Sequence, residues 1–233
     1  MYSLSSNLKI NLTHIPHSNA FIWIIDNVID DFDKVLHYCD KIAYFNPVGA
    51  DGTLFPGMRD EMPKPYYRLL SSLFNRLSEH PQGHIFKQFQ IIKSWLSKVT
   101  LPPEQLDVIQ TMPHFDSLSV NHIAAVHYLN DNCLGGTSFY RYKGIDKLQL
   151  AHEDKAVILK MVEEVKQAAD VRGGYINETD QFFEKVFSVD AKSNRLIIYA
   201  SNILHSANIT EAVEFDKSSS YNRTTINSFF IVN

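Results

Sequence analysis

Residues 113–139 of the chain read PHFDSLSVNHIAAVHYLNDNCLGGTSF, a stretch in which a strand, a polar turn and a second strand follow one another. Val120–Leu129 has the apolar pattern of a buried strand, and Asp131–Leu134 is a polar turn. Gly135 and Gly136 then open the next strand, and paired glycines permit a bulge or a close backbone approach where a Cβ would clash. Taken alone, the stretch predicts an ordinary antiparallel hairpin.

Strand patterns continue through the rest of the chain, especially its second half. Further strands are predicted at Phe21–Ile25, Phe86–Val99, Arg195–Ala200 and Thr224–Val232, and helices at Asp31–Ile42, Tyr66–Ser78 and Ala151–Ala169. The segment Asn46–Pro65 is rich in Gly and Pro and is predicted to be a long loop that covers another part of the molecule. The order of elements favours an antiparallel β-core wrapped by helices over a βαβ alternation.

Composition narrows the class of protein. The chain has 233 residues, a net charge of −4, 45% hydrophobic and 12% aromatic residues, which suits a packed core and excludes disorder of the bulk. The acidic balance argues against a broad nucleic-acid surface, and two cysteines cannot build a disulfide framework. Without a signal peptide or an apolar run near ~20 residues, the sequence predicts a cytoplasmic protein with no membrane partner.

His114 and Asp116 form an H-x-D pair. In an extended segment, residues two apart point to the same side, so both side chains reach one cation. An imidazole with a carboxylate suits a divalent ion such as Fe, Mn, Co or Zn. Pairs of this kind also arise by chance, and taken alone this one fits a satisfied surface pair better.

Two later segments each bring a further polar side chain. The strand Arg195–Ala200 runs through a short turn to His205, which delivers an imidazole just beyond a strand. On the last strand, alternation places Arg223, Thr225 and Asn227 on one face. An inward arginine with a hydroxyl two residues further on is suited to clamp a carboxylate. Taken singly, a structural histidine and an exposed edge-strand arginine explain these residues more simply.

The ordered set H-x-D, Tyr-Leu-Asn, Gly-Gly-Thr-x-Phe, strand-then-His and Arg-x-Thr resembles the 2-oxoglutarate- and Fe(II)-dependent oxygenases, specifically their prolyl-4-hydroxylase-like branch. The resemblance covers roughly Met112–Asn233, with a looser likeness at residues 25–27. It implies a mainly β fold with flanking helices, a double-stranded β-helix (jelly roll). One domain over residues 1–233 is expected, with residues 1–100 as N-terminal support made of helices and strands, residues 101–233 as the jelly-roll core and a helical insertion at about 151–187.

The resemblance also implies roles for individual residues. The three iron ligands correspond to His114, Asp116 and His205. Arg223, helped by Thr225, corresponds to the clamp on the distal carboxylate of 2-oxoglutarate, and Tyr128 to a tyrosine that shares this carboxylate. The separation of 18 positions between His205 and Arg223 exceeds the family's usual gap, so Thr210–Tyr221 is expected to be a long loop. Arg195 is the nearest, less suitable competitor for the clamp.

The function implied is that of a hydroxylase which uses Fe(II) and 2-oxoglutarate and releases succinate and CO₂. A peptide, an amino acid or a small metabolite would each fit as substrate, and three further side chains are expected to line the pocket: His122, Asn227 and Arg59. Two other classes stay open. One is a non-catalytic jelly-roll binding module that has lost cosubstrate binding, and the other is a cupin-like hydrolase or isomerase with another metal.

Overall fold

The computed structural model describes residues 2–168, 173–216, 218–219 and 221–233. The helices are α1 (Phe32–Lys41), α2 (Lys64–Ser78) and α3 (Lys155–Gln167). The strands are β1 (Lys9–His14), β2 (Phe21–Asp26), β3 (Gly57–Glu61), β4 (Phe89–Val99), β5 (His122–Tyr128), β6 (Thr137–Tyr142), β7 (Phe183–Val189), β8 (Arg195–Ala200), β9 (His205–Ala207) and β10 (Thr224–Val232).

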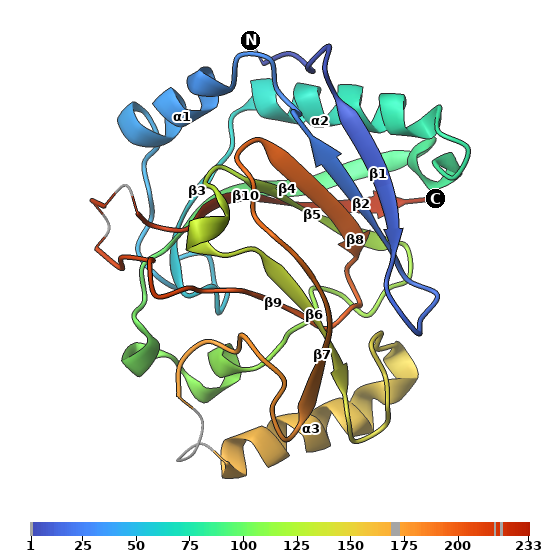
Figure 1. Cartoon of the computed structure of the whole chain (residues 1–233), viewed down its shortest axis with the longest axis vertical. Coiled ribbons are helices and arrows are strands. Elements are labelled where there is room, and N and C mark those ends of the chain that lie inside the picture. Colours follow the sequence, from blue (N-terminus) through green and yellow to red (C-terminus); the bar gives the residue numbers. More distant parts are fainter. Residues whose placement is uncertain (1, 169–172, 217, 220) are drawn as a thin grey trace.

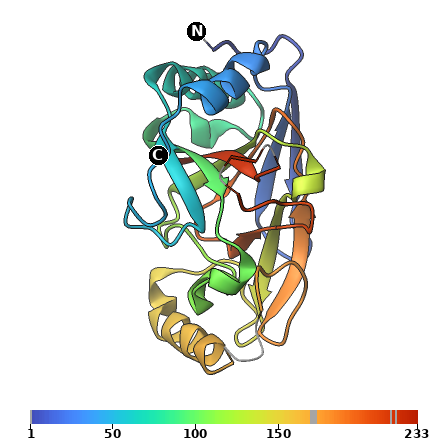
Figure 2. The same cartoon turned by 90° about the vertical axis from the view of Figure 1, so that its left-hand side faces the viewer.

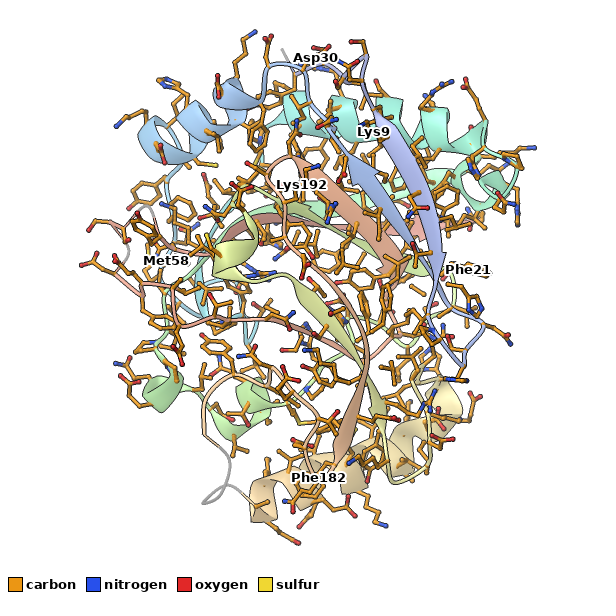
Figure 3. All side chains as sticks on the ribbon, viewed as in Figure 1. Lys9, Phe21, Asp30, Met58, Phe182 and Lys192 are labelled. Carbon is orange, nitrogen blue, oxygen red and sulfur yellow. The ribbon has the colours of Figure 1, made fainter. Side chains whose placement is uncertain are left out.

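Two antiparallel sheets form the body of the molecule (Figure 1). The larger has the strand order β1-β2-β8-β5-β10-β4-β3, and the smaller has the order β7-β6-β9. Side chains fill the space between them (Figure 3), where one apolar cluster draws on both sheets, with Val126 and Ile197 from the larger and Phe139 and Val189 from the smaller. The predicted mainly β architecture with flanking helices, a jelly roll, is confirmed.

The central strand β5 is buried on both faces, and this decides which side chains reach the space between the sheets. Its odd-numbered residues Ile123 and Ala125 belong to the cluster that α1 and α2 cover. Its even-numbered residues, such as Ala124 and Val126, belong to the cluster between the sheets. Because successive side chains of a strand point to opposite faces, each central strand serves the helical layer with one parity and the interior of the jelly roll with the other.

The helices lie at opposite ends of the molecule. Figures 1 and 2 both place α1 and α2 at one end and α3 at the other, beside β7. The amphipathic α2 buries Leu70, Leu73 and Phe74 against the larger sheet, whereas α3 buries Met161 and Val165 against the smaller sheet. Over the described residues, no helix combines the length and apolarity that a membrane crossing requires.

The predicted helices and strands are present, with three corrections. The segment Asn46–Pro65 is not entirely a loop, because it contains β3, an edge strand paired with β4. Among its described residues, the insertion expected at about 151–187 is helical only at its start, and β7 begins at Phe183. Residues 1–100 do more than support the core, because they contribute β1 to β4 to the larger sheet. Ala169, the last residue of the predicted third helix, lies outside the described residues.

Candidate metal centre

Backbone hydrogen bonds hold the H-x-D segment against the start of β9. The His114 N–H donates to the His205 carbonyl at 2.9 Å, and the His205 N–H donates back to the His114 carbonyl at 2.8 Å. The Asp116 N–H donates to the carbonyl of Ser201, in the turn before β9, at 2.8 Å. Segments about ninety positions apart in the sequence are thereby fixed side by side, and their side chains meet.

The three side chains converge on one point. Asp116 Oδ1 lies 3.9 Å from His114 Nε2, and Asp116 Oδ2 lies 3.6 Å from His205 Nε2. One ligand atom from each residue lies within 4.8 Å of the others. Two imidazoles and one carboxylate facing a common centre form a donor set suited to a divalent transition metal with open coordination positions. We call these three residues the triad.

The protonation of the triad also suits a metal. The carbonyl of Ile203 can only accept, so His205 Nδ1 donates to it at 2.9 Å and leaves the Nε2 lone pair facing the centre. Burial lowers the pKa of His205 to about 4, against the opposing effect of that hydrogen bond. Desolvation of its ring and the neighbouring His205 also lower the pKa of His114 to about 4, while 56% of its side chain stays exposed. Both imidazoles are therefore neutral near pH 7, the form that binds metals.

A small chamber of about 80 Å³ adjoins the triad inside the jelly roll. We call it the inner chamber. Besides the triad, its polar lining comes from both sheets: Thr137, Tyr199, Arg223 and Asn227, together with Arg59 from the edge strand β3.

Arg223 is the unusual member of this lining. Its side chain is buried, its Nη2 donates to the Gly136 carbonyl at 2.9 Å, and its Nε has no hydrogen-bond partner. Among the described residues, no carboxylate forms an ion pair with Arg223. The titratable groups that act on it are the hydroxyls of tyrosines, and the guanidinium carbon lies 5.8 Å from the centre of the Tyr128 ring. Burial lowers the pKa of Arg223. A buried cation without an anionic partner is costly, and an anionic ligand would compensate it.

The carbonyl that accepts the Arg223 hydrogen bond belongs to Gly136, the second of the paired glycines. A Cβ on Gly136 would lie 1.9 Å from the carbonyl oxygen of Val189, so the backbone of β6 passes too close to β7 for any side chain. Gly135 has a φ of +88°, which glycine adopts readily. The close backbone approach predicted for this pair is confirmed. The long separation between His205 and Arg223 is taken up by a loop, since the described residues of 208–223 contain no strand or helix.

The structure brings most of the other sequence-predicted residues to the same region. Asn227 lines the inner chamber, as expected from alternation on β10, whereas Thr225 hydrogen-bonds the Asn227 Oδ1 at 3.1 Å. Tyr128 donates its hydroxyl hydrogen to Thr137 Oγ1 at 2.7 Å, close to Arg223. His122 lies at the far start of β5, and the described residues lining either cavity beside the triad do not include it.

Arg195, the competing arginine, has a different role. It binds both carboxylate oxygens of Asp26, with its Nε 2.6 Å from Oδ1 and its Nη2 3.1 Å from Oδ2, and so links β8 to β2. Sequence reasoning missed Tyr199, whose ring lies 4.8 Å from the ring of His205. Burial, together with the charge of Asp116, raises the pKa of Tyr199 well above its usual value. Alternation within β8 puts Tyr199 on the same face as Ile197, toward the space between the sheets. This pattern could have indicated from the sequence that Tyr199 lies near the site.

A larger cavity of about 510 Å³ opens next to the triad. We call it the outer cavity. The segment 53–56 before β3 forms one wall, so part of the predicted covering loop does line a cavity. The outer cavity and the inner chamber share Phe55, Arg59 and Phe229 as lining, together with His114 and Asp116 of the triad. The two spaces therefore meet at the candidate metal centre.

Comparisons with known proteins agree with this architecture. A family model described as "Family of unknown function (DUF6445)" matches residues 6–230. A comparison with curated protein sequences finds no match. The solved structure of the non-heme alpha ketoglutarate dependent carbocyclase SnoK from nogalamycin biosynthesis aligns over 90% of this chain and 79% of its own, with 11% identity and a TM-score of 0.51. HygX from Streptomyces hygroscopicus, with nickel and 2-oxoglutarate bound, aligns over 90% and 82%, with 11% identity and a TM-score of 0.50. These likenesses show a shared fold.

Proposed function

The chain belongs to the family of unknown function DUF6445, and we propose that it is an Fe(II)- and 2-oxoglutarate-dependent dioxygenase that hydroxylates a small molecule or a peptide. One observation carries the proposal: the His114, Asp116 and His205 triad shares a chamber with Arg223, a buried cation that has no carboxylate partner among the described residues. A dianionic cosubstrate that chelates the metal with one end and meets Arg223 with the other would satisfy both features.

The residues present fit both groups. His114, Asp116 and His205 would hold the iron on one side and leave the remaining coordination positions for 2-oxoglutarate and O₂. Arg223 would receive the distal carboxylate through its unpartnered Nε, and Gly136 already orients the guanidinium through Nη2. HygX, which has the same fold, was crystallised with nickel and 2-oxoglutarate.

When bound, iron with 2-oxoglutarate supplies oxidation by O₂: one oxygen atom enters succinate as CO₂ leaves, and the other enters a substrate C–H bond as a hydroxyl. The chain's own residues would bind the metal and the cosubstrate, orient them and exclude water. Ile203 holds the His205 ring in the tautomer that ligates, and Tyr199 packs an aromatic edge against the same ring. The buried part of the chamber lining, which includes Ala124, Tyr199 and Arg223, would keep water out on the side away from the outer cavity.

Within this class we place the chain in the prolyl-4-hydroxylase-like branch, on the strength of its ordered motifs between Pro113 and Thr225. Because SnoK is a carbocyclase on the same fold, the fold is compatible with more than one outcome for the oxidised substrate. Hydroxylation is the outcome that we propose, and incorporation of ¹⁸O from ¹⁸O₂ into the product distinguishes it from ring closure, which incorporates none.

Anaerobic titration with Fe(II) and then 2-oxoglutarate tests the proposal. The chelate is expected to give a weak visible charge-transfer band in the wild-type protein, and His205→Ala should abolish it because one ligand is lost. His122→Ala is the matched control, since His122 lines neither cavity beside the triad, and it should leave the band unchanged. If the wild type binds metal without forming the band, the dioxygenase assignment is wrong. That result would favour the two alternatives, a non-catalytic binding module or a metal-dependent hydrolase or isomerase.

A further inference from the structure

Resting on the proposed function, we propose that the outer cavity binds a substrate with an apolar, ring-bearing body and a carboxylate, and that Arg59 receives this carboxylate. Arg59 belongs to β3, the edge strand within the segment that sequence reasoning treated as a covering loop. It lines both the outer cavity and the inner chamber. A carboxylate bound there would hold the neighbouring carbons of the substrate beside the triad.

The Arg59 side chain is fixed by the segment that precedes β3. Its Nη1 donates to Asp51 Oδ2 at 3.0 Å and to Thr53 Oγ1 at 3.2 Å. Its guanidinium carbon lies 4.1 Å from the centre of the Phe55 ring, a cation–π contact. Asp51 is itself held by the backbone N–H and the hydroxyl of Thr53. With only 11% of its side chain exposed, Arg59 is held in place before any ligand arrives.

The opposite edge of the same guanidinium has no hydrogen-bond partner among the described residues. Arg59 Nε is buried without a hydrogen-bond partner, and no described residue accepts a hydrogen bond from its Nη2. The adjacent N–H groups of Nε and Nη2 form the fork that matches the two oxygens of a carboxylate. Asp51 binds Nη1 and does not compete for this fork. A ligand carboxylate would therefore complete the hydrogen bonding of a group that the protein leaves incomplete.

The walls of the outer cavity indicate the rest of the ligand. They carry the aromatic rings of Phe55, Trp95, Phe115, Tyr175 and Phe229, which suit the faces of an apolar ring system. Among the described residues that line this cavity, the only carboxylate is Asp116 of the triad, which the metal would engage. A free ammonium group would find no other carboxylate to pair with among these lining residues. The lining therefore favours an aromatic or alicyclic carboxylic acid without a free amine.

Ligand binding to the protein loaded with Fe(II) and 2-oxoglutarate under anaerobic conditions tests this proposal. The probes are 3-phenylpropionate and indole-3-propionate, each compared with its neutral amide, and calorimetry measures the dissociation constants. We expect each carboxylate to bind at least about tenfold more tightly than its amide, because a charge-assisted fork replaces a weaker contact. The charge-transfer band, recorded on the same sample, reports on the proposed function independently.

Two variants and a control locate the effect. Arg59→Gln should remove the preference for the carboxylate, and it should weaken the binding of the carboxylate probes by more than it weakens the binding of 2-oxoglutarate. Arg76→Gln, which alters an exposed arginine paired with Glu79 on α2, should leave both unchanged. In Asp51→Asn the side-chain oxygen can still accept from Arg59 Nη1 and keep the guanidinium in place. The variant should therefore strengthen carboxylate binding by removing the competing anion, a result that a purely structural role for Arg59 does not produce.

The outcomes separate this proposal from the proposed function. If the band forms and the carboxylates bind no more tightly than the amides, or do not bind, the substrate assignment is overturned and the dioxygenase assignment stands. If Arg59→Gln weakens 2-oxoglutarate instead of the probes, Arg59 serves the cosubstrate and the proposal is again overturned. If the band is absent while the probes show the expected preference, the proposed function fails and the carboxylate site stands.

Discussion

Replacing Arg223 by methionine is expected to make the ligand-free protein more stable and, at the same time, insensitive to 2-oxoglutarate. Arg223 is buried, its Nε lacks a partner, and no carboxylate among the described residues compensates its charge. Methionine has a similar length and fills irregular apolar space well. The substitution therefore removes a desolvated charge without opening a large cavity.

The magnitude follows from the contacts that are lost and kept. The lost hydrogen bond, from Nη2 to the Gly136 carbonyl, is worth about 1.5–3 kcal/mol as a charged contact. That carbonyl still accepts the N–H of Asn208 at 3.0 Å, so no acceptor is left unsatisfied. Against this stands a desolvation cost of several kcal/mol for a buried ion. A net stabilisation of about 2 kcal/mol would raise the melting temperature by about 4–8 °C for a chain of this size.

Thermal unfolding of the protein without ligands, with Mn(II) alone, and with Mn(II) and 2-oxoglutarate measures both effects, because the last step isolates the increment due to 2-oxoglutarate. At 100 times its dissociation constant, a ligand stabilises the wild type by about 2.7 kcal/mol, and Arg223→Met should lose this increment. Arg195→Met is the matched control: it leaves Asp26 without its bidentate partner, so it should lower the melting temperature and keep the ligand-induced increment. A lower melting temperature for ligand-free Arg223→Met, or an increment equal to that of the wild type, would refute the reasoning.

Three further substitutions test individual contacts through urea unfolding. The hydrogen bond from Arg195, against the opposing effect of burial, lowers the pKa of Asp26. The ionised Asp26 carboxylate therefore stabilises the folded protein above the usual carboxylate pKa range, and this stabilisation is lost as the pH falls through the lowered pKa. The difference in unfolding free energy between the wild type and Asp26→Asn should be constant near pH 7 and should shrink below pH about 4. Gly136→Ala would set a Cβ 1.9 Å from a carbonyl oxygen of β7, so it should cost about 1–3 kcal/mol and weaken 2-oxoglutarate binding. Tyr66→Phe should cost about 1–3 kcal/mol because the buried His127 Nδ1 loses its partner, now 3.0 Å away; an unchanged midpoint in either of these two variants would contradict the contact concerned.

The central strands were predictable because both of their faces are buried. In β8, Leu196 and Ile198 pack under the helices, while Ile197 packs between the sheets, so the strand reads as a continuous apolar run. The edge strands were not. β1 alternates between half-buried and exposed positions, and β3 lies within a Gly- and Pro-rich segment and forms because β4 offers a free edge. Their pairing depends on neighbours that a local pattern does not contain.

The same distinction applies to the site. The spacing of His114 and Asp116 placed two side chains together by local geometry, and alternation on β10 placed Arg223 and Asn227 on the chamber's face. The ion pair of Arg59 with a residue eight positions earlier depends on the path of an irregular segment. No periodicity encodes that path, so sequence reasoning could propose Arg59 as pocket lining without showing what fixes it.

The pairing of the arginines gives the strongest physical argument for a ligand. Arg195 meets both oxygens of Asp26, and Arg59 meets Asp51 with one edge of its guanidinium. Arg223 is the most deeply buried of these three, and among the described residues it has no carboxylate partner at all. The fold pairs the two less buried arginines of these three and leaves the deepest one, beside the triad, without a carboxylate partner among the described residues, at a cost in stability. Such a loss persists at sites where a ligand supplies the missing charge, and the Arg-x-Thr pattern alone would read the same whether its arginine were paired or not.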